Sequence, residues 1–202
     1  MDYRRTYRSA AVTFVDLVDR VPADRLDGPG LGDWTLRALI GHTLSSALIQ
    51  VPPVLATPAK SVNVAAAEGY FAFVRDVPAD VYAAAVAASD ADAQESAAAL
   101  DDAGALAGRA TQALATVADD DVVSTPVGGM RVRDWLPTRT FELVVHGTDV
   151  AAAAGVPVEF DPAAVAGATL LAAKIAVVLG DGAVLLRALT GRSSLPSSFS
   201  VV

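Results

Sequence analysis

The side chains with the clearest capacity for chemistry are the only two histidines of the chain, His42 and His146, together with Glu142. Residues four positions apart lie on one face of an α-helix, so Glu142 and His146 can reach one point from a single helix. Two imidazoles and one carboxylate give a divalent metal three ligands and leave positions open for water or substrate, as catalytic zinc sites do. The same donors suit nickel, iron or manganese. We therefore expect His42, Glu142 and His146 to hold one divalent ion, with zinc as the first choice.

Each of these residues also has an ordinary structural interpretation. At about 100° per residue, Glu142 and His146 belong to a polar stripe on one helix, which can be either its solvated face or an interior polar site. The stripe consists of Trp135, Arg139, Glu142, His146 and Asp149. A lone histidine such as His42, at the edge of an apolar stripe, is more often a hydrogen-bonded core residue than a ligand. By spacing alone, Glu-x-x-x-His is a weak motif.

Helices must position these side chains, and the sequence predicts an all-α protein with little or no strand. Apolar residues recur at helical spacing, bounded by prolines, glycines and aspartates. The expected helices cover residues 5–20, 33–50, 61–75, 78–88, 90–118, 134–154, 162–180 and 183–189. Their expected boundaries include caps at Asp33, Asp134 and Asp161, stops at Pro52 and Gly155, a split at Pro78, and a loop or short hairpin around 126–129. We expect a helical bundle over residues 1–180, followed by a short C-terminal helix and tail over 181–202.

The composition excludes several classes of function. The 202 residues carry a net charge of -8, which would repel nucleic acid and anionic membrane surfaces. There is no apolar run of 18 residues without a charge and no secretory signal pattern, so we expect a cytoplasmic protein without a membrane span. The chain has no cysteine. Any thiol chemistry must therefore use a thiol carried by a small molecule.

Two segments resemble a known family. GDWTLRALIGHTLSSALI, which contains His42, resembles the first metal-ligand helix of the DinB-like superfamily, and more specifically of the mycothiol-dependent maleylpyruvate isomerase family of actinobacteria. STPVGGMRVRDWLPTRTFELVVHGTDVAAAAG is similar to the second signature of that family, and LLRALTGRSSLP to its chain ends. The resemblance implies a DinB-like four-helix bundle with additional C-terminal helices. The family's ligands are a histidine after a tryptophan-containing turn and a Glu-x-x-x-His pair, which match His42, Glu142 and His146.

The resemblance also implies a metal-dependent S-transferase or isomerase that uses mycothiol as co-substrate and acts on a small electrophile. Asp149 would orient a ligand. Arg139 would bind a carboxylate of the thiol or substrate, or form a structural ion pair, and Arg192 would reach an anionic ligand. The founding isomerase carries a further sterol-carrier-like domain with a catalytic arginine, and no residue up to Val202 matches it. The alternative is a non-catalytic helical module that binds a metal or ligand.

The sequence leaves open one macromolecular partner, a second copy of the chain. The apolar segment ATLLAAKIAVVL can either complete the core or form the surface of a homodimer. Small molecules, a thiol and an electrophile, are the other expected partners.

Overall fold

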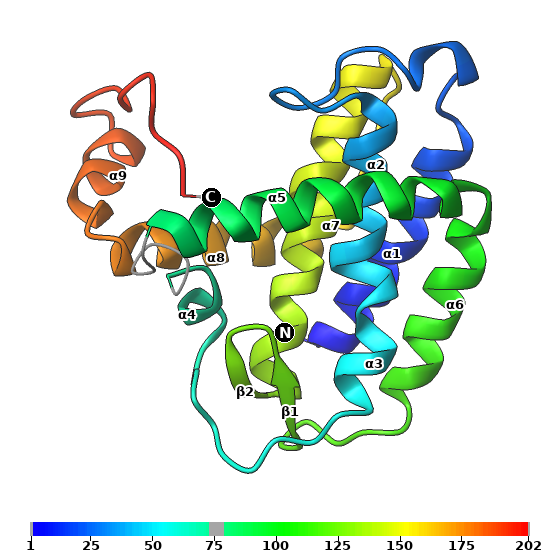
Figure 1. Cartoon of the computed structure of the whole chain (residues 1–202). Helices are drawn as coiled ribbons and strands as arrows, with labels where there is room; N and C mark the ends of the chain where they lie inside the picture. The colour runs from blue at the N-terminus through cyan, green and yellow to red at the C-terminus, as the bar shows by residue number, and fades with distance from the viewer. Residues whose placement is uncertain (1, 73–78, 202) are drawn as a thin grey trace.

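A computed structural model describes residues 2–72 and 79–201 of the chain. Four helical segments run side by side as a bundle in Figure 1. They are α1 (Tyr3–Asp19), α2 (Leu36–Leu44) continued by α3 (Val51–Leu55), α6 (Ala103–Leu114) and α7 (Val132–Ala154). Helix α1 packs on both α7 and α6, and α2 packs on α7. The expected mostly helical bundle is therefore confirmed.

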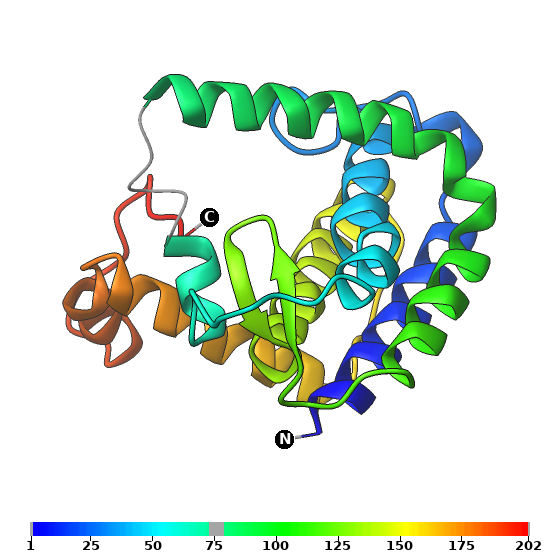
Figure 2. The same cartoon turned by 60° about the horizontal axis from the view of Figure 1, so that its bottom comes forward.

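Helix α5 (Ala79–Ser96) runs across the front of this bundle in Figure 1, and Figure 2 shows it lying over α2. A 3₁₀ segment, Ala97–Asp102, joins it to α6. The crossing is close because Gly41 of α2 has no side chain: a Cβ there would lie 2.1 Å from the carbonyl oxygen of Ala93. Glycine at this position therefore allows α5 to cover the part of α2 that carries His42.

The remaining helices pack on the far side of α7. Helix α8 (Pro162–Val178) contacts α7 and the short α4 (Ala67–Ala72), and α9 (Gly182–Leu189) packs on α8. Among the described residues, one stretch, Leu36–Leu55, is long and apolar enough to cross a membrane by length and composition. Because 56% of that stretch is buried inside the protein, it is better explained as a core helix.

A small hairpin leads into α7. Strands β1 (Val122–Thr125) and β2 (Gly128–Arg131) pair antiparallel, with Val123 opposite Met130. The turn between them is the one expected around residues 126–129, and Gly128 takes a φ of 111°, which favours glycine. The described chain has no other paired strands, so the expectation of little strand is confirmed.

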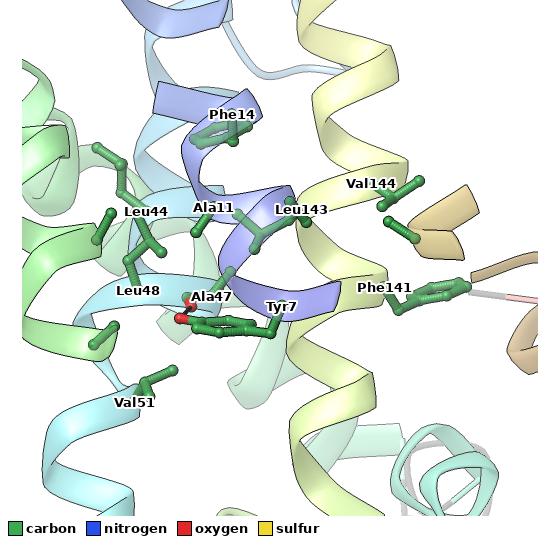
Figure 3. Packing of buried hydrophobic residues seen from close by; sticks show 14 of the residues in the cluster. Tyr7, Ala11, Phe14, Leu44, Ala47, Leu48, Val51, Phe141, Leu143 and Val144 are labelled. Carbon is green, nitrogen blue, oxygen red and sulfur yellow. Dashed lines mark hydrogen bonds between the residues drawn. The ribbon is translucent and has the colours of Figure 1, made fainter. Parts of the chain in front are cut away.

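Aromatic and aliphatic side chains from α1, α2 and α7 form the centre of the core. In Figure 3, Tyr7 and Phe14 of α1 lie between the helical segment that carries Leu48 and helix α7, which carries Leu143. All four are fully buried. The hydroxyl of Tyr7 donates a hydrogen bond of 2.7 Å to the carbonyl oxygen of Ala47, which satisfies its only polar group.

The second helix differs most from its prediction. It is capped by Thr35, whose hydroxyl accepts from the Ala38 amide, and not by Asp33. Nor do the prolines stop it. A π-helical turn (Ser45–Ile49) follows α2, and Pro52 then lies in the first turn of α3, where a missing amide hydrogen costs nothing.

The helices expected over 61–75, 78–88 and 90–118 also have different boundaries in the structure. Among the described residues of the first range, 61–72, only α4 forms, because the amides of Asn63 and Val64 are bound by the carbonyl of Gly129 on the hairpin. Pro78 lies outside the described residues. Helix α5 runs without a break through residues 88–90, and the interruption comes at the 3₁₀ segment instead.

Helix α7 begins earlier than expected, and Asp134 is not its cap. The helix starts at Val132 directly after β2, and the carbonyl of Asp121 accepts from the Val132 amide at 3.0 Å, so no side-chain cap is needed there. Asp134 lies in the first turn, and Pro137 lies inside the helix instead of in that turn. The predicted end at Gly155 is confirmed, with a φ of 69°.

Candidate metal centre

Three side chains from two helices converge where α2 and α7 pack together. One ligand atom from each of His42, Glu142 and His146 lies within 4.8 Å of the other two. Nε2 of His146 is 3.2 Å from Oε2 of Glu142, and the rings of His42 and His146 are 5.0 Å apart between centroids. The side chains of Glu142 and His146 are only 13% and 15% exposed. This part of the polar stripe is therefore an interior site and not a solvated face.

His42 is oriented by residues that the sequence analysis did not single out. Its Nδ1 lies 3.2 Å from the hydroxyl oxygen of Ser89 on α5. The ring of Trp34 packs against it at 4.8 Å, and Trp34 Nε1 donates to Asp90 of α5 at 2.7 Å. With Nδ1 engaged, Nε2 of His42 is the nitrogen left for another partner.

Asp149 lies beside His146, the histidine that it was predicted to orient. Its Oδ2 lies 3.3 Å from Nδ1 of His146, on the side opposite the Nε2 contact with Glu142. A carboxylate that accepts from the second ring nitrogen fixes the tautomer and the ring orientation of a ligating histidine. Ser89 and Asp149 thus perform equivalent tasks for the two histidines.

Arg139 is buried beside Glu142, with 1% of its side chain exposed. Its Nη2 lies 3.8 Å from Oε1 of Glu142, and its Nη1 donates to the carbonyl of Ser46 at 2.6 Å. Of the two roles considered for Arg139, the structure shows the ion pair. The burial leaves no guanidinium surface on which a substrate carboxylate could bind.

The carbonyl that holds Arg139 belongs to the π-helical turn. Within this turn the amide of Gln50 donates to the carbonyl of Ser45, five residues back instead of four. The carbonyl of Ser46 is thus released from that amide and accepts from Arg139. Such turns inside α-helices occur often at functional sites.

Arg192 does not join this cluster. It is exposed, and its guanidinium donates to the carbonyl of Thr190 in its own turn. In Figures 1 and 2 the chain after α9 lies on the α8 side of the molecule, away from α2. The predicted contact of Arg192 with an anionic ligand has no support in the described geometry.

The three converging groups have different protonation. Burial and the nearby charge of His146 lower the pKa of His42. Burial opposes ionisation of Glu142, but its hydrogen bond with His146 and the charge of Arg139 outweigh burial and lower its pKa. Burial also opposes the charged form of His146, yet hydrogen bonds with Asp149 and Glu142 raise its pKa to about 9. Near neutral pH the cluster therefore holds an imidazolium between two carboxylates, with His42 neutral.

The donor set fits a divalent cation. A tetrahedral ion with bonds of about 2.0 to 2.1 Å separates its ligand atoms by roughly 3.3 Å. Nε2 of His146 and Oε2 of Glu142 already have this spacing, at 3.2 Å. All three ligand atoms lie within 4.8 Å of one another, so a small side-chain rotation would bring the full set to the spacing that the ion requires. Two neutral imidazoles and one carboxylate suit borderline metals such as zinc, nickel, iron and manganese.

Comparison with known proteins gives one match. Residues 7–151 match the family described as the mycothiol maleylpyruvate isomerase N-terminal domain. This span contains His42, Glu142 and His146. No curated protein and no solved structure matches the chain.

Proposed function

We propose a function from the premise that this chain belongs to the mycothiol maleylpyruvate isomerase N-terminal domain family. The proposed activity is that of a metal-dependent S-transferase or isomerase, which joins a low-molecular-weight thiol of the mycothiol type to a small electrophile. The observation that carries the proposal is the convergence of His42, Glu142 and His146 within 4.8 Å. A cytoplasmic location, where small thiols are kept reduced, is part of the proposal.

In this proposal His42, Glu142 and His146 hold one divalent ion, with zinc preferred and nickel, iron or manganese as alternatives. A bound divalent ion supplies a charge that favours the thiolate over the thiol at neutral pH. The absence of cysteine from the chain agrees with a thiol that comes from a co-substrate.

The residues around the ligands keep them in place during the reaction. Asp149 accepts from Nδ1 of His146, and Ser89 engages Nδ1 of His42, so that both imidazoles present Nε2 to the centre. The thiol loses its proton and its sulfur forms a bond with an electrophilic carbon. With a halide substrate the halide leaves with the bonding electrons, whereas an activated alkene takes up a proton at the neighbouring carbon.

The test is a turnover assay in which metal and thiol are varied separately. Purified protein is loaded with zinc, nickel or manganese and offered mycothiol, or a simpler thiol, with activated alkenes and organic halides. We expect consumption of an electrophile only when both metal and thiol are present, and none with His42→Ala. Stoichiometric bound metal without any turnover would instead favour the non-catalytic ligand-binding module.

A further inference from the structure

The two carboxylate oxygens of Glu142 have different neighbours. Oε2 faces Nε2 of His146 at 3.2 Å, inside the proposed metal site. Oε1 faces Nη2 of Arg139 at 3.8 Å, outside it. A carboxylate can bind a metal through one oxygen or through both, and the difference decides how many positions remain for other ligands. The partner of Oε1 therefore matters for the site.

Arg139 is fixed from three sides. Its Nη1 donates to the carbonyl of Ser46 at 2.6 Å, and its Nε donates to the hydroxyl of Thr138 at 2.9 Å. The ring of Tyr70 lies 4.7 Å from the guanidinium carbon. Because guanidinium is planar, these contacts also fix the direction in which Nη2 points.

One donor of this guanidinium has no hydrogen-bond partner among the described residues. Nη2 is fully buried and unpaired, and the nearest carboxylate is that of Glu142. A buried donor without a hydrogen-bond partner is costly. A small rotation of Glu142 would shorten the 3.8 Å ion pair into a hydrogen bond and remove this cost.

We propose that Arg139 is a positioning residue that holds Oε1 of Glu142, so that the carboxylate binds the metal through Oε2 alone. The π-helical turn is the anchor of this arrangement, because the Ser46 carbonyl that it releases holds the other end of Arg139. A second bond from Oε1 would fill a position that the thiol needs. The inference rests on the proposed metal site and adds to it the number of oxygens that Glu142 contributes.

Arg139→Gln tests the inference with Co²⁺ as the probe, in the full chain and without any activity measurement. Loss of the group that orients Glu142 should weaken Co²⁺ binding by about 10- to 100-fold. With Oε1 released, the coordination number should rise, and the visible absorption of bound Co²⁺ should become weaker. Arg133→Gln, an exposed arginine on the same helix, is the matched control and should change neither quantity.

A second pair of variants separates positioning from a merely structural role. Glu142→Gln keeps one amide oxygen that can still bind Co²⁺ weakly but has no second carboxylate oxygen to hold, so in this background Arg139→Gln should change the remaining Co²⁺ affinity by less than about twofold. An equal loss of affinity in both backgrounds would show that Arg139 acts on the fold and would overturn the inference. So would wild-type affinity and absorption in Arg139→Gln.

Two measurements keep the inference testable if Arg139→Gln does not fold. Arg139→Lys keeps the charge but cannot reach both Ser46 and Glu142, so it should show an intermediate loss of affinity, and wild-type behaviour would contradict the inference. X-ray absorption of the cobalt-loaded wild type should show one Glu142 oxygen on the metal, and two would overturn the inference. Failure of the wild type to bind Co²⁺ at all would instead overturn the proposed metal site.

Discussion

Nδ1 of His42 and the hydroxyl of Ser89, 47 positions apart in the chain, lie 3.2 Å from each other where α5 crosses α2. His42 therefore depends on a helix outside the four-helix bundle for its orientation. His146 differs, because Asp149 lies one turn further along the same helix. Thus a residue far away in the sequence holds His42, whereas a residue on the same helix holds His146.

Ser89→Ala should weaken metal binding without unfolding the protein. The variant removes the contact that fixes the His42 ring, and loss of such a contact costs about 10- to 100-fold in metal affinity. Calorimetric titration with Zn²⁺ measures the effect. Gln94→Ala, an exposed position on α5, is the control and should bind as the wild type does. Unchanged affinity in Ser89→Ala would show that His42 is held in another way.

His146→Ala should abolish both metal binding and thiol-dependent turnover while the helices remain. Removing one of three ligands destroys the site, and the loss of a largely buried imidazole should cost about 1 to 3 kcal/mol in the free energy of unfolding. Elemental analysis, an electrophile assay and urea unfolding followed by circular dichroism measure the three quantities. Thr148→Ala, exposed on the same helix, should leave all of them unchanged. Zinc retained by His146→Ala would refute the ligand assignment.

Metal binding should release close to one proton per site near pH 7.5. His146, with a pKa raised to about 9, is protonated in the metal-free protein and must lose its proton to become a ligand. The lowered pKa values of His42 and Glu142 mean that these two groups are already deprotonated. Metal affinity should therefore rise with pH and level off above about 9, where His146 is neutral. Calorimetry in buffers of different ionisation enthalpy counts the protons, and a release of none or of two would contradict this prediction.

Gly41→Ala should destabilise the protein and move α5. The new Cβ would lie 2.1 Å from the backbone oxygen of Ala93, so the two helices must separate. We expect a loss of about 1 to 3 kcal/mol or more, as for other overpacked sites. Gly108→Ala is the matched control, because no atom lies within 4 Å of a Cβ there. That variant should be neutral or slightly stabilising, since alanine favours a helix. Thermal unfolding compares the stability of the two variants, and equal stability would contradict this prediction.

The sequence alone predicted the parts of the site that lie within one helix. Glu142, His146 and Asp149 follow from helical spacing, and His42 was included as the only other histidine of the chain, an assignment that the resemblance also implied. It could not predict Ser89, because nothing in a sequence without aligned relatives connects two residues 47 positions apart. The close crossing that makes this contact depends on the absence of a side chain at Gly41, and a glycine within a helix does not by itself indicate which element packs against it.

The boundaries that were wrong have two kinds of cause. Some are local: Thr35 and not Asp33 caps α2, and Pro52 is accepted because the adjacent π-helical turn restarts the helix at Val51. Another lies outside the helix, because the Asp121 carbonyl binds the first amide of α7 and Asp134 is not needed as a cap. Helical periodicity predicts that a helix forms, but it does not predict which of several nearby groups ends it.

The π-helical turn between α2 and α3 also divides one continuous helix into two parts. The direction in which the side chains of one part point is set independently of the other part. Each additional residue in a helix rotates all later side chains by about 100° relative to the earlier ones. Residues up to Leu44 are in register with α7 and the proposed metal site, whereas those from Val51 onward are in register with α6 and β1. The deletion of a single residue from Ser45–Ile49 would leave both halves chemically intact and would still turn one of them away from its partners.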